Sequence, residues 1–269
     1  MEVRALRSGD LPGIRAITLA TGRSEEESGA DPGYVELLRL SGRALVAVDG
    51  DSVLGWAAVV PTPCGVLLSD LFVDPVVHAR GVGTALLRRL RPAPQFAFSS
   101  MHPAALPLYV RAGLVPSWPL LYVSGPVDRL PRGALHVDPV DAGTAAAVEA
   151  ELTGARARTA VYRYWTRRPG AVALVVRDGS RPVAVGAGRP GVPGVLSHLT
   201  CPDAGSAAGA LYAAVAALGG DHVAFCVPGP HPAVRLLLAS GFRVDALDVT
   251  MRPPHAQVPA GWIYASGLG

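Results

Sequence analysis

The chain has 269 residues, half of them hydrophobic, a formal net charge of +3 and a mean hydropathy of +0.33. This composition excludes a disordered chain, and the length suits one large domain or two of about 130 residues each. No apolar run reaches the roughly 18 residues that a membrane span needs, and the N-terminus lacks a signal pattern, so we expect a cytoplasmic protein without membrane association. The basic residues are all Arg and are scattered along the chain, which argues against nucleic-acid binding.

Cysteine usage gives no sign of a metal site. Cys64, Cys201 and Cys226 form no CxxC pair and have no His at ligand spacing. We therefore expect reduced thiols, no bound metal and no cysteine nucleophile.

In chain order, the first half begins with "MEVRALRSGDLPGIRAI", which predicts a short alternating strand, a turn with Gly and Asp, and a helix. "RALVAVDGDSVLGWAAVV" predicts a β-hairpin that turns at Asp49-Gly50. "VLLSDLFV" reads as a buried strand that ends near Pro75, and "TALLRRL" begins a helix after two glycines. "MHPAALPLYVRAGL" then predicts a helix that ends at Gly113 and leads into a strand.

The second half repeats this pattern. "LHVDPVDAGTAAAVEAE" corresponds to the start of the chain, "VALVVRDGSRPVAVGAGR" to the hairpin, "GVLSHLTCPD" to the buried strand, and "PHPAVRLLLASGF" to the last helix. Two copies of one α/β unit are the economical interpretation, each with the order strand, helix, hairpin, strand, helix, strand, helix, strand.

A linker without periodicity, "SGPVDRLPRG", joins the copies. We expect one domain at residues 1–128 and another at residues 134–269, whose C-terminal tail docks on the body through Trp262, Ile263 and Tyr264.

The segment "HARGVGTALL" is the main candidate for a ligand site. A strand, a glycine turn and a helix start aim free N–H groups and the positive end of a helix dipole at one point, which suits an anion. The loop lacks the Lys-Ser/Thr ending of a nucleotide-triphosphate loop and the third glycine of a dinucleotide fingerprint. By itself the turn fits a tight corner at least as well as a ligand site.

Two motifs together resemble the Gcn5-related N-acetyltransferases. "HARGVG" is similar to their Q/R-x-x-G-x-G/A loop, with His78 at the Gln/Arg position, and "HPAALPLYVRAGL" is similar to N-x-x-A-x-x-L-Y-x-x-x-G-F, with His102 for Asn and Leu114 for Phe. The resemblance covers residues 1 to about 125. It implies an α/β fold of two tandem domains, each a mixed, mostly antiparallel sheet flanked by helices.

The resemblance also implies acetyl-CoA, or another acyl-CoA, as the donor. Backbone amides around its diphosphate would come from the glycine loop, Arg80 would add charge or remain a solvated loop residue, and a strand amide near Phe72 or Val73 would polarise the thioester carbonyl. His102 would bind the donor or cap a helix. The predicted donor-binding residues are Phe72, Val73, His78, Ala79, Arg80, Gly81, Val82, Gly83, Thr84 and His102.

Three residues are candidates for the chemistry. Tyr109 matches the tyrosine of the second motif, and a phenol, with an ordinary pKa near 10, can donate a proton to a departing thiolate. Asp70 is the only carboxylate within the strand before the loop and is either a base, an amine anchor or a structural hydrogen-bonding group. Ser69 would then lie on the opposite face of the strand and hold a relay water.

The second copy lacks the loop motif, and Leu237 falls opposite Tyr109, so we expect it to keep the fold and lose the chemistry. It would act as the partner half of an internal pseudo-dimer in a monomeric protein. Acceptor selection is expected between the first helix and the second strand, where Glu25, Glu26, Glu27 and Tyr34 lie.

The resemblance implies an N-acyltransferase acting on the amine of a small molecule, such as an antibiotic or a natural-product intermediate. The alternatives are a non-catalytic acyl-CoA-binding or regulatory module, and another acyl-CoA reaction, such as decarboxylation, on the same fold.

Overall fold

A computed structural model describes residues 1–22 and 28–269 and divides them into two compact units. Unit 1 comprises Met1–Pro116, Met251–Ala256 and Leu268. Unit 2 comprises Ser117–Thr250, Gln257–Gly267 and Gly269.

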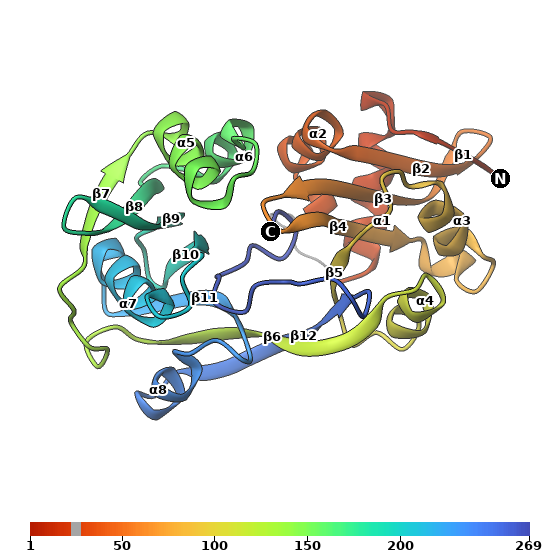
Figure 1. Cartoon of the computed structure of the whole chain (residues 1–269). Helices are drawn as coiled ribbons and strands as arrows, with labels where there is room; N and C mark the ends of the chain where they lie inside the picture. Colours follow the sequence, from red (N-terminus) through yellow and green to blue (C-terminus); the bar gives the residue numbers. More distant parts are fainter. Residues whose placement is uncertain (23–27) are drawn as a thin grey trace. The chain divides into compact units, whose positions relative to one another are not determined.

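Unit 1 is a sheet with helices on both faces (Figure 1). Its strand order is β1-β2-β3-β4-β5, with a parallel β4–β5 pair and antiparallel pairs elsewhere. The elements are β1 (Glu2–Ala5), α1 (Leu11–Ala20), α2 (Pro32–Ser41), β2 (Arg43–Asp49), β3 (Ser52–Thr62), β4 (Gly65–Val73), α3 (Val82–Arg89), β5 (Phe96–Ser99) and α4 (Ala105–Arg111).

Each face of the unit 1 sheet has its own helices. A Cβ atom at Gly55 of β3 would lie 3.1 Å from Val82 of α3, whereas Trp56, the next residue, lies against Gly29, just before α2. Successive side chains of a strand point to opposite faces, so α3 covers one face, and α1 and α2 cover the other.

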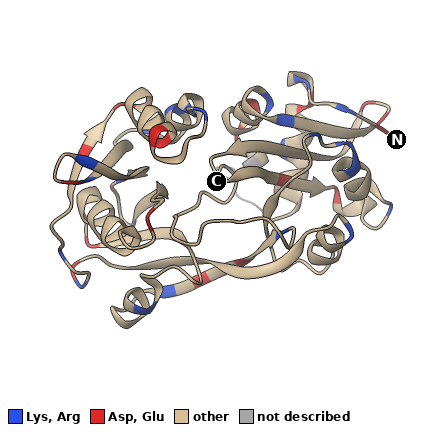
Figure 2. Ribbon diagram, viewed as in Figure 1, with Lys and Arg blue, Asp and Glu red and all other residues tan. Residues whose placement is uncertain are grey.

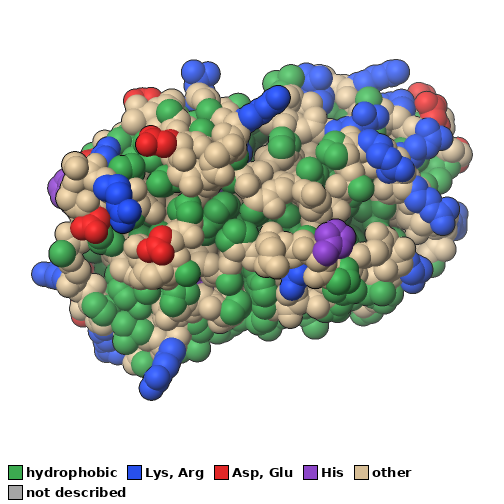
Figure 3. Space-filling model, in the orientation of Figure 1, with side chains coloured by type: hydrophobic (Ala, Val, Ile, Leu, Met, Phe, Trp, Pro, Cys, Tyr) green, Lys and Arg blue, Asp and Glu red, His purple; other side chains and the backbone are tan. Residues whose placement is uncertain are grey.

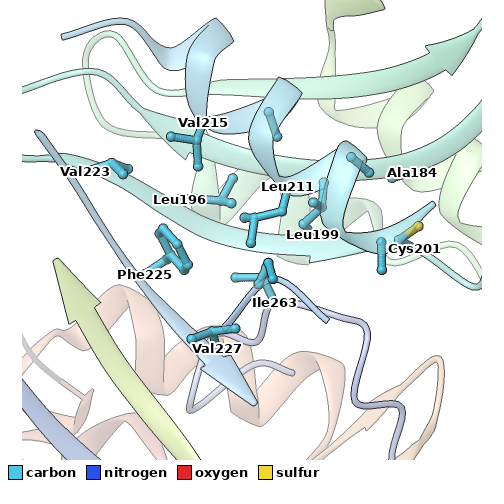
Figure 4. Close-up of a cluster of buried hydrophobic side chains, with 14 of the residues drawn as sticks. Ala184, Leu196, Leu199, Cys201, Leu211, Val215, Val223, Phe225, Val227 and Ile263 are labelled. Carbon is cyan, nitrogen blue, oxygen red and sulfur yellow. The ribbon is translucent and has the colours of Figure 1, made fainter. Parts of the chain in front are cut away.

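Unit 2 repeats the arrangement, with strand order β12-β6-β11-β10-β9-β8-β7 and a parallel β10–β11 pair. Its elements are β6 (Val115–Pro126), β7 (His136–Val140), α5 (Ala142–Thr153), α6 (Thr159–Trp165), β8 (Val172–Asp178), β9 (Arg181–Arg189), β10 (Gly194–Thr200), α7 (Ala207–Leu218), β11 (His222–Pro228), α8 (Val234–Ala239) and β12 (Arg243–Arg252). Figure 4 shows its core, in which Leu211 and Val215 of α7 pack on Leu196 and Phe225 of the sheet.

The predicted mixed, mostly antiparallel sheet flanked by helices is confirmed, and so is the order of strands. The hairpins turn where expected, because Gly50 and Gly179 adopt φ values of 56° and 57°. One difference occurs in both copies: a second helix, α2 or α6, precedes the hairpin. Asp31 caps α2 by accepting a hydrogen bond from Gly33, and the apolar spacing from Tyr34 to Leu38 buries one face of that helix.

The last strand of the first repeat lies in unit 2. β6 pairs antiparallel with β11, with Leu120 opposite Pro228 at one end and Pro126 opposite His222 at the other. The Tyr122 hydroxyl of β6 donates a hydrogen bond to Asp248 of β12 (2.7 Å). The compact units therefore divide at Pro116, before the limits of 128 and 134 that the linker composition predicts. The limits predicted from the sequence describe where the repeat ends and stay a prediction. The compact units instead follow the pairing of the strands.

Within residues 1–22 and 28–269, no helix combines the length and the apolar character needed to cross a lipid bilayer.

Candidate active site

Unit 1 contains a cavity of about 1050 Å³ where β4 and β5 diverge. Predicted donor-binding residues supply much of its wall: Phe72, Val73, His78, Ala79, Gly81, Val82, Gly83, Thr84 and His102. Tyr109 lines it as well. The structure thus brings together residues that are nearly 40 positions apart in sequence.

The cavity exists because the parallel pairing of β4 with β5 is short. Only Leu67 and Leu68 pair with β5, at Phe96 and Ala97. On the other side of β4, Leu68 pairs with Val59 and Asp70 with Ala58, which leaves Ser69 as a bulge residue. Bulges bend a strand and raise its twist, so β4 leaves β5 from this point.

The edge of β4 that faces the gap carries backbone groups of Leu71 and Val73 that do not pair with β3. The Asp74 amide donates to the Leu54 carbonyl of β3 (2.9 Å). Because hydrogen-bonding direction alternates along an antiparallel ladder, the Phe72 amide also points toward β3, and the backbone groups of Leu71 and Val73 point away from it. The Nε2 atom of His78 contacts the Val73 carbonyl oxygen at 3.0 Å, which confirms that direction. Of the two amides predicted to polarise a carbonyl, Val73 fits and Phe72 does not.

The glycine loop presents a second set of amides. Gly81, at φ 82°, immediately precedes α3, and the first helical hydrogen bond runs from the Ala85 amide to the Gly81 carbonyl (2.9 Å). The amides of Val82, Gly83 and Thr84 therefore have no acceptor within the helix, and these residues line the cavity. Such a helix start attracts an anionic group.

Ala79, at φ 63°, is the non-glycine residue with a positive φ among those described. This conformation costs a non-glycine residue about 1–3 kcal/mol and tends to occur at ligand sites. It turns the loop between the short helix Pro75–Val77 and the start of α3.

Two histidines meet at the cavity wall. The rings of His78 and His102 contact edge to face with 5.8 Å between centroids. The Nδ1 atom of His102 accepts a hydrogen bond from the Ala104 amide (3.2 Å), so its Nε2 atom carries the proton and is the ring's remaining donor. His78 and His102 are also the two polar departures from the family motifs, and the structure places them in contact.

Tyr109 lies on α4 and is 8 % exposed. Its carbonyl accepts the Leu114 amide (3.0 Å) at the helix end, which Gly113 closes with φ 90°. The helix thus holds the tyrosine at the cavity with little exposed surface.

Asp70, Ser69 and Arg80 stand apart from the described lining residues. The Asp70 carboxylate is buried on the α1–α2 face, where the Tyr34 hydroxyl donates to it at 2.6 Å. The Ser69 hydroxyl oxygen is buried at the bulge, and no described group hydrogen-bonds to it. Tyr34, expected to line an acceptor cleft, is likewise buried against Asp70, and Glu25, Glu26 and Glu27 lie outside the described residues.

Sequence reasoning missed part of the cavity wall. Thr21 and Gly22 contribute from the end of α1, Leu71 from β4, Met101 from the loop before α4, and Arg111 from the last turn of α4. Helical spacing offered a signal for Arg111 alone, because it follows Leu108 by three residues and so shares its helix face.

Unit 1 carries basic residues at the cavity, where Arg111 lines the wall, and at the far end of α3. Arg residues occur on elements of both units (Figure 2), and α3 carries Arg88 and Arg89 in its last turn. Figure 3 shows several Arg side chains gathered over the part of unit 1 where α3 lies. Positive charge on this part of unit 1 favours the approach of an anionic ligand.

The corresponding elements of unit 2 lack these features. Leu237 accepts the Phe242 amide at 3.1 Å as Tyr109 accepts that of Leu114, so a leucine replaces the phenol. At the start of α7, the Asp203 carboxylate accepts hydrogen bonds from the amides of Gly205 (3.3 Å) and Ser206 (2.9 Å). An internal carboxylate therefore holds two amides directly before α7, whereas Asp74 of unit 1 holds the Val76 amide, five residues before Gly81 at the start of α3.

Comparison with known proteins supports the fold by structure and not by sequence. No family model and no curated protein matches the chain. Among solved structures, a proposed acetyltransferase from Pyrococcus horikoshii is 17 % identical, with a TM-score of 0.68 over 100 % of this chain and 94 % of that one.

Two further structures agree. A GCN5-related N-acetyltransferase from Anabaena variabilis is 12 % identical, with a TM-score of 0.63 over 93 % of this chain and 71 % of that one. A tandem GNAT protein from the clavulanic acid biosynthesis pathway is 16 % identical, with a TM-score of 0.58 over 93 % of this chain and 97 % of that one. The chain therefore has the fold of the Gcn5-related N-acetyltransferases.

Proposed function

We propose that unit 1 transfers an acetyl or other acyl group from an acyl-CoA to the amine of a small molecule. The observation that carries this proposal is the divergence of β4 from β5, which opens one cavity to the α3 amides, the Val73 amide and Tyr109. The fold itself is compatible with several chemistries, so the site and not the fold decides.

The residues present fit an acyl-CoA. The amides of Val82, Gly83 and Thr84 suit a diphosphate, and the loop conformation at Ala79 and Gly81 turns the backbone toward it. A cavity of about 1050 Å³ is at the upper end of the range for small-molecule sites, which suits a long ligand.

Acyl-CoA would supply the activated acyl group as a thioester. The Val73 amide, turned into the gap, would donate to a carbonyl oxygen on which negative charge develops. Tyr109 would hold a proton for the departing thiolate.

The lining residues come from both faces of the sheet. Gly83 and Leu108 belong to the α3–α4 side, whereas Thr21 and Gly22 follow α1 on the opposite side. This supports donor entry from the α3 side and approach of the amine from the end of α1. One structural neighbour comes from clavulanic acid biosynthesis, which keeps natural-product intermediates and antibiotics among the acceptors to test.

The test follows the release of free thiol from acetyl-CoA over a panel of small amines. We expect Tyr109→Phe to bind CoA as the wild type does and to lose about 100- to 10,000-fold in kcat, the range for a positioned proton donor. Tyr212→Phe, the same change on α7 of unit 2, is the matched control and should retain full activity. A wild-type rate in Tyr109→Phe would remove the phenol from the mechanism.

The burial of Asp70 favours a second candidate, a module that binds acyl-CoA without turnover. Its carboxylate is held by Tyr34 and does not line the cavity, so the predicted base has no direct path to an amine. CoA binding by the wild type without thiol release from any amine would support this module. Loss of the carboxyl group from a malonyl-type donor without release of free thiol would instead support decarboxylation.

A further inference from the structure

β4 and β10 carry the same irregularity, which fixes the correspondence between the units. In β10, Leu196 pairs with Gly188 and His198 with Ala187, which leaves Ser197 unpaired as Ser69 is in β4. Leu199 therefore corresponds to Leu71. In each unit, the parallel neighbour strand pairs only before the bulge.

In unit 2, the C-terminal tail occupies the edge of β10 that this divergence leaves open. The Leu199 amide donates to the Ile263 carbonyl (3.0 Å), and the Ile263 amide donates to the Leu199 carbonyl (2.9 Å). Ile263 is fully buried and packs beside Leu211 and Val227 (Figure 4). In unit 1, the corresponding backbone groups of Leu71 face the cavity.

A second contact places the tail at another ligand-facing position. His231 corresponds to His102, and its Nδ1 atom likewise accepts an amide two residues later, that of Ala233 (3.1 Å). Its Nε2 atom donates to the Gly261 carbonyl at 3.2 Å. Burial lowers the pKa of His231 to about 4, so the ring is neutral and keeps this donor role at neutral pH.

At the phosphate end of the site, a carboxylate lies just before α7. The Asp203 carboxylate takes the amides before α7 and would repel a second anion. The connection from β10 to α7 spans residues 201–206, shorter than the connection from β4 to α3 at residues 74–81.

We infer that residues 261–263 occupy, in unit 2, the position that the pantetheine arm of the donor takes in unit 1. Unit 2 thus contains a second site for an extended, amide-bearing chain, and the protein fills it with its own backbone. The inference rests on the proposed function of unit 1 for the identity of the ligand, because pantetheine carries the amides that would replace those of the tail.

The experiment is calorimetric titration of the full chain with pantetheine after saturation of unit 1 with CoA. Ile263→Gly weakens tail docking, and we expect this variant to bind one additional pantetheine per chain, whereas the wild type binds it far more weakly because the docked tail competes. Val258→Gly removes a buried side chain from the same tail without touching the Leu199–Ile263 pair, and it should behave as the wild type. A folded Ile263→Gly chain without pantetheine binding, or equal binding in both variants, would contradict the inference.

Amide hydrogen exchange on the wild type covers the case in which Ile263→Gly does not fold. With CoA present, rising pantetheine should speed exchange at the Ile263 amide and leave Leu199 protected, because the ligand replaces the tail as its partner. Unchanged exchange at Ile263 would contradict competition. Failure of CoA to bind the wild type would refute the proposed function of unit 1. It would leave the inference about unit 2 standing, because the pantetheine titration of the Ile263→Gly variant reports on unit 2.

Discussion

The two glycines of the loop are required for different physical reasons. Gly81 adopts φ 82°, and a Cβ atom there would meet no atom within 4 Å, so its backbone angle is the constraint. Gly83 has no positive φ, but a Cβ atom would lie 3.1 Å from Leu108 and 3.6 Å from Val73. Gly83 therefore permits close packing of α3 on β4 and α4, and Gly81 permits the turn.

We expect Gly81→Ala to lower the free energy of unfolding by about 1–2 kcal/mol, the cost of a left-handed conformation for a residue with a Cβ atom. Acyl-CoA binding should weaken as well, because the α3 amides would lose their direction. Urea unfolding and CoA titration measure the two effects. Gly133→Ala, at a position with open space and no positive φ, is the control and should change neither quantity.

The position of Asp70 shows how a single extra residue in a strand changes which face the following side chains point to. Strict alternation places Ser69 and Asp70 on opposite faces, but the bulge at Ser69 breaks the period of the strand at that point. The sequence identified a carboxylate on the relevant strand. Asp70 accepts a hydrogen bond from Tyr34 and lies away from the cavity wall because α2 packs over it. The sequence around Pro32 did not predict that helix.

At the scale of elements, a buried polar cluster ties α5, α6 and β10 together in unit 2. Arg158 donates two hydrogen bonds of 2.8 Å to the Glu149 carboxylate, and Thr200 donates a third (3.1 Å). The Trp165 ring stacks on His198, with 4.7 Å between centroids. Burial acts to raise the pKa of Glu149, but the hydrogen bonds from Arg158 and His198 outweigh it and hold that pKa well below its usual range.

We expect Glu149→Gln to lower the free energy of unfolding by about 3–5 kcal/mol, because the Arg158 charge would remain buried without its partner. Glu36→Gln breaks the similar but exposed pair with Arg39 on α2 and is the matched control, with a much smaller effect. Chemical denaturation of both variants at pH 7 measures the difference. Equal losses would show that burial of the Glu149–Arg158 pair is energetically unimportant.

The depressed pKa of Glu149 also predicts the pH dependence. An unfolded Glu titrates near 4.3, so the stabilisation is fully present above that pH and declines as pH falls through the region below it. The wild type should therefore lose stability between about pH 5 and pH 2 more steeply than Glu149→Gln. Parallel curves for the two proteins would contradict a native-state carboxylate at Glu149.

At the scale of the whole molecule, the repeat in the sequence and the compact units divide the chain differently. β6 belongs to the first repeat and lies in unit 2, between β12 and β11. A fragment that begins at residue 134 would lose this strand and expose its neighbours, and bare strand edges promote aggregation.

We expect the fragment 134–269 to aggregate and the fragment 117–269, which keeps most of β6, to show more native structure. Circular dichroism with thermal melting, together with size-exclusion chromatography, compares the two directly. Equal behaviour of the fragments would show that β6 is dispensable for unit 2.

The monomeric state expected from the internal repeat is a separate prediction. Sedimentation equilibrium should give a single species of 27.7 kDa over a range of concentrations. A concentration-dependent increase in mass would contradict it.

By itself, the sequence determined the features that depend on local order along the chain. The repeat, the hairpin turns at Gly50 and Gly179, the helix ends at Gly113 and Gly241, and the glycine loop all follow from residue type and spacing. The predicted donor-binding residues came from motifs, and most of them line one cavity because the motifs lie on neighbouring elements.

Only the tertiary structure decided the features that depend on contacts distant in sequence. Three such features are the direction of the Val73 amide, the hydrogen bond between Tyr34 and Asp70, and the pairing of Ile263 with Leu199. Each depends on residues from separate elements. A bulge, a strand that joins the other unit and a tail that fills an open strand edge leave no periodic signal. Their energies come from backbone pairing and burial, which exist only once the chain has folded.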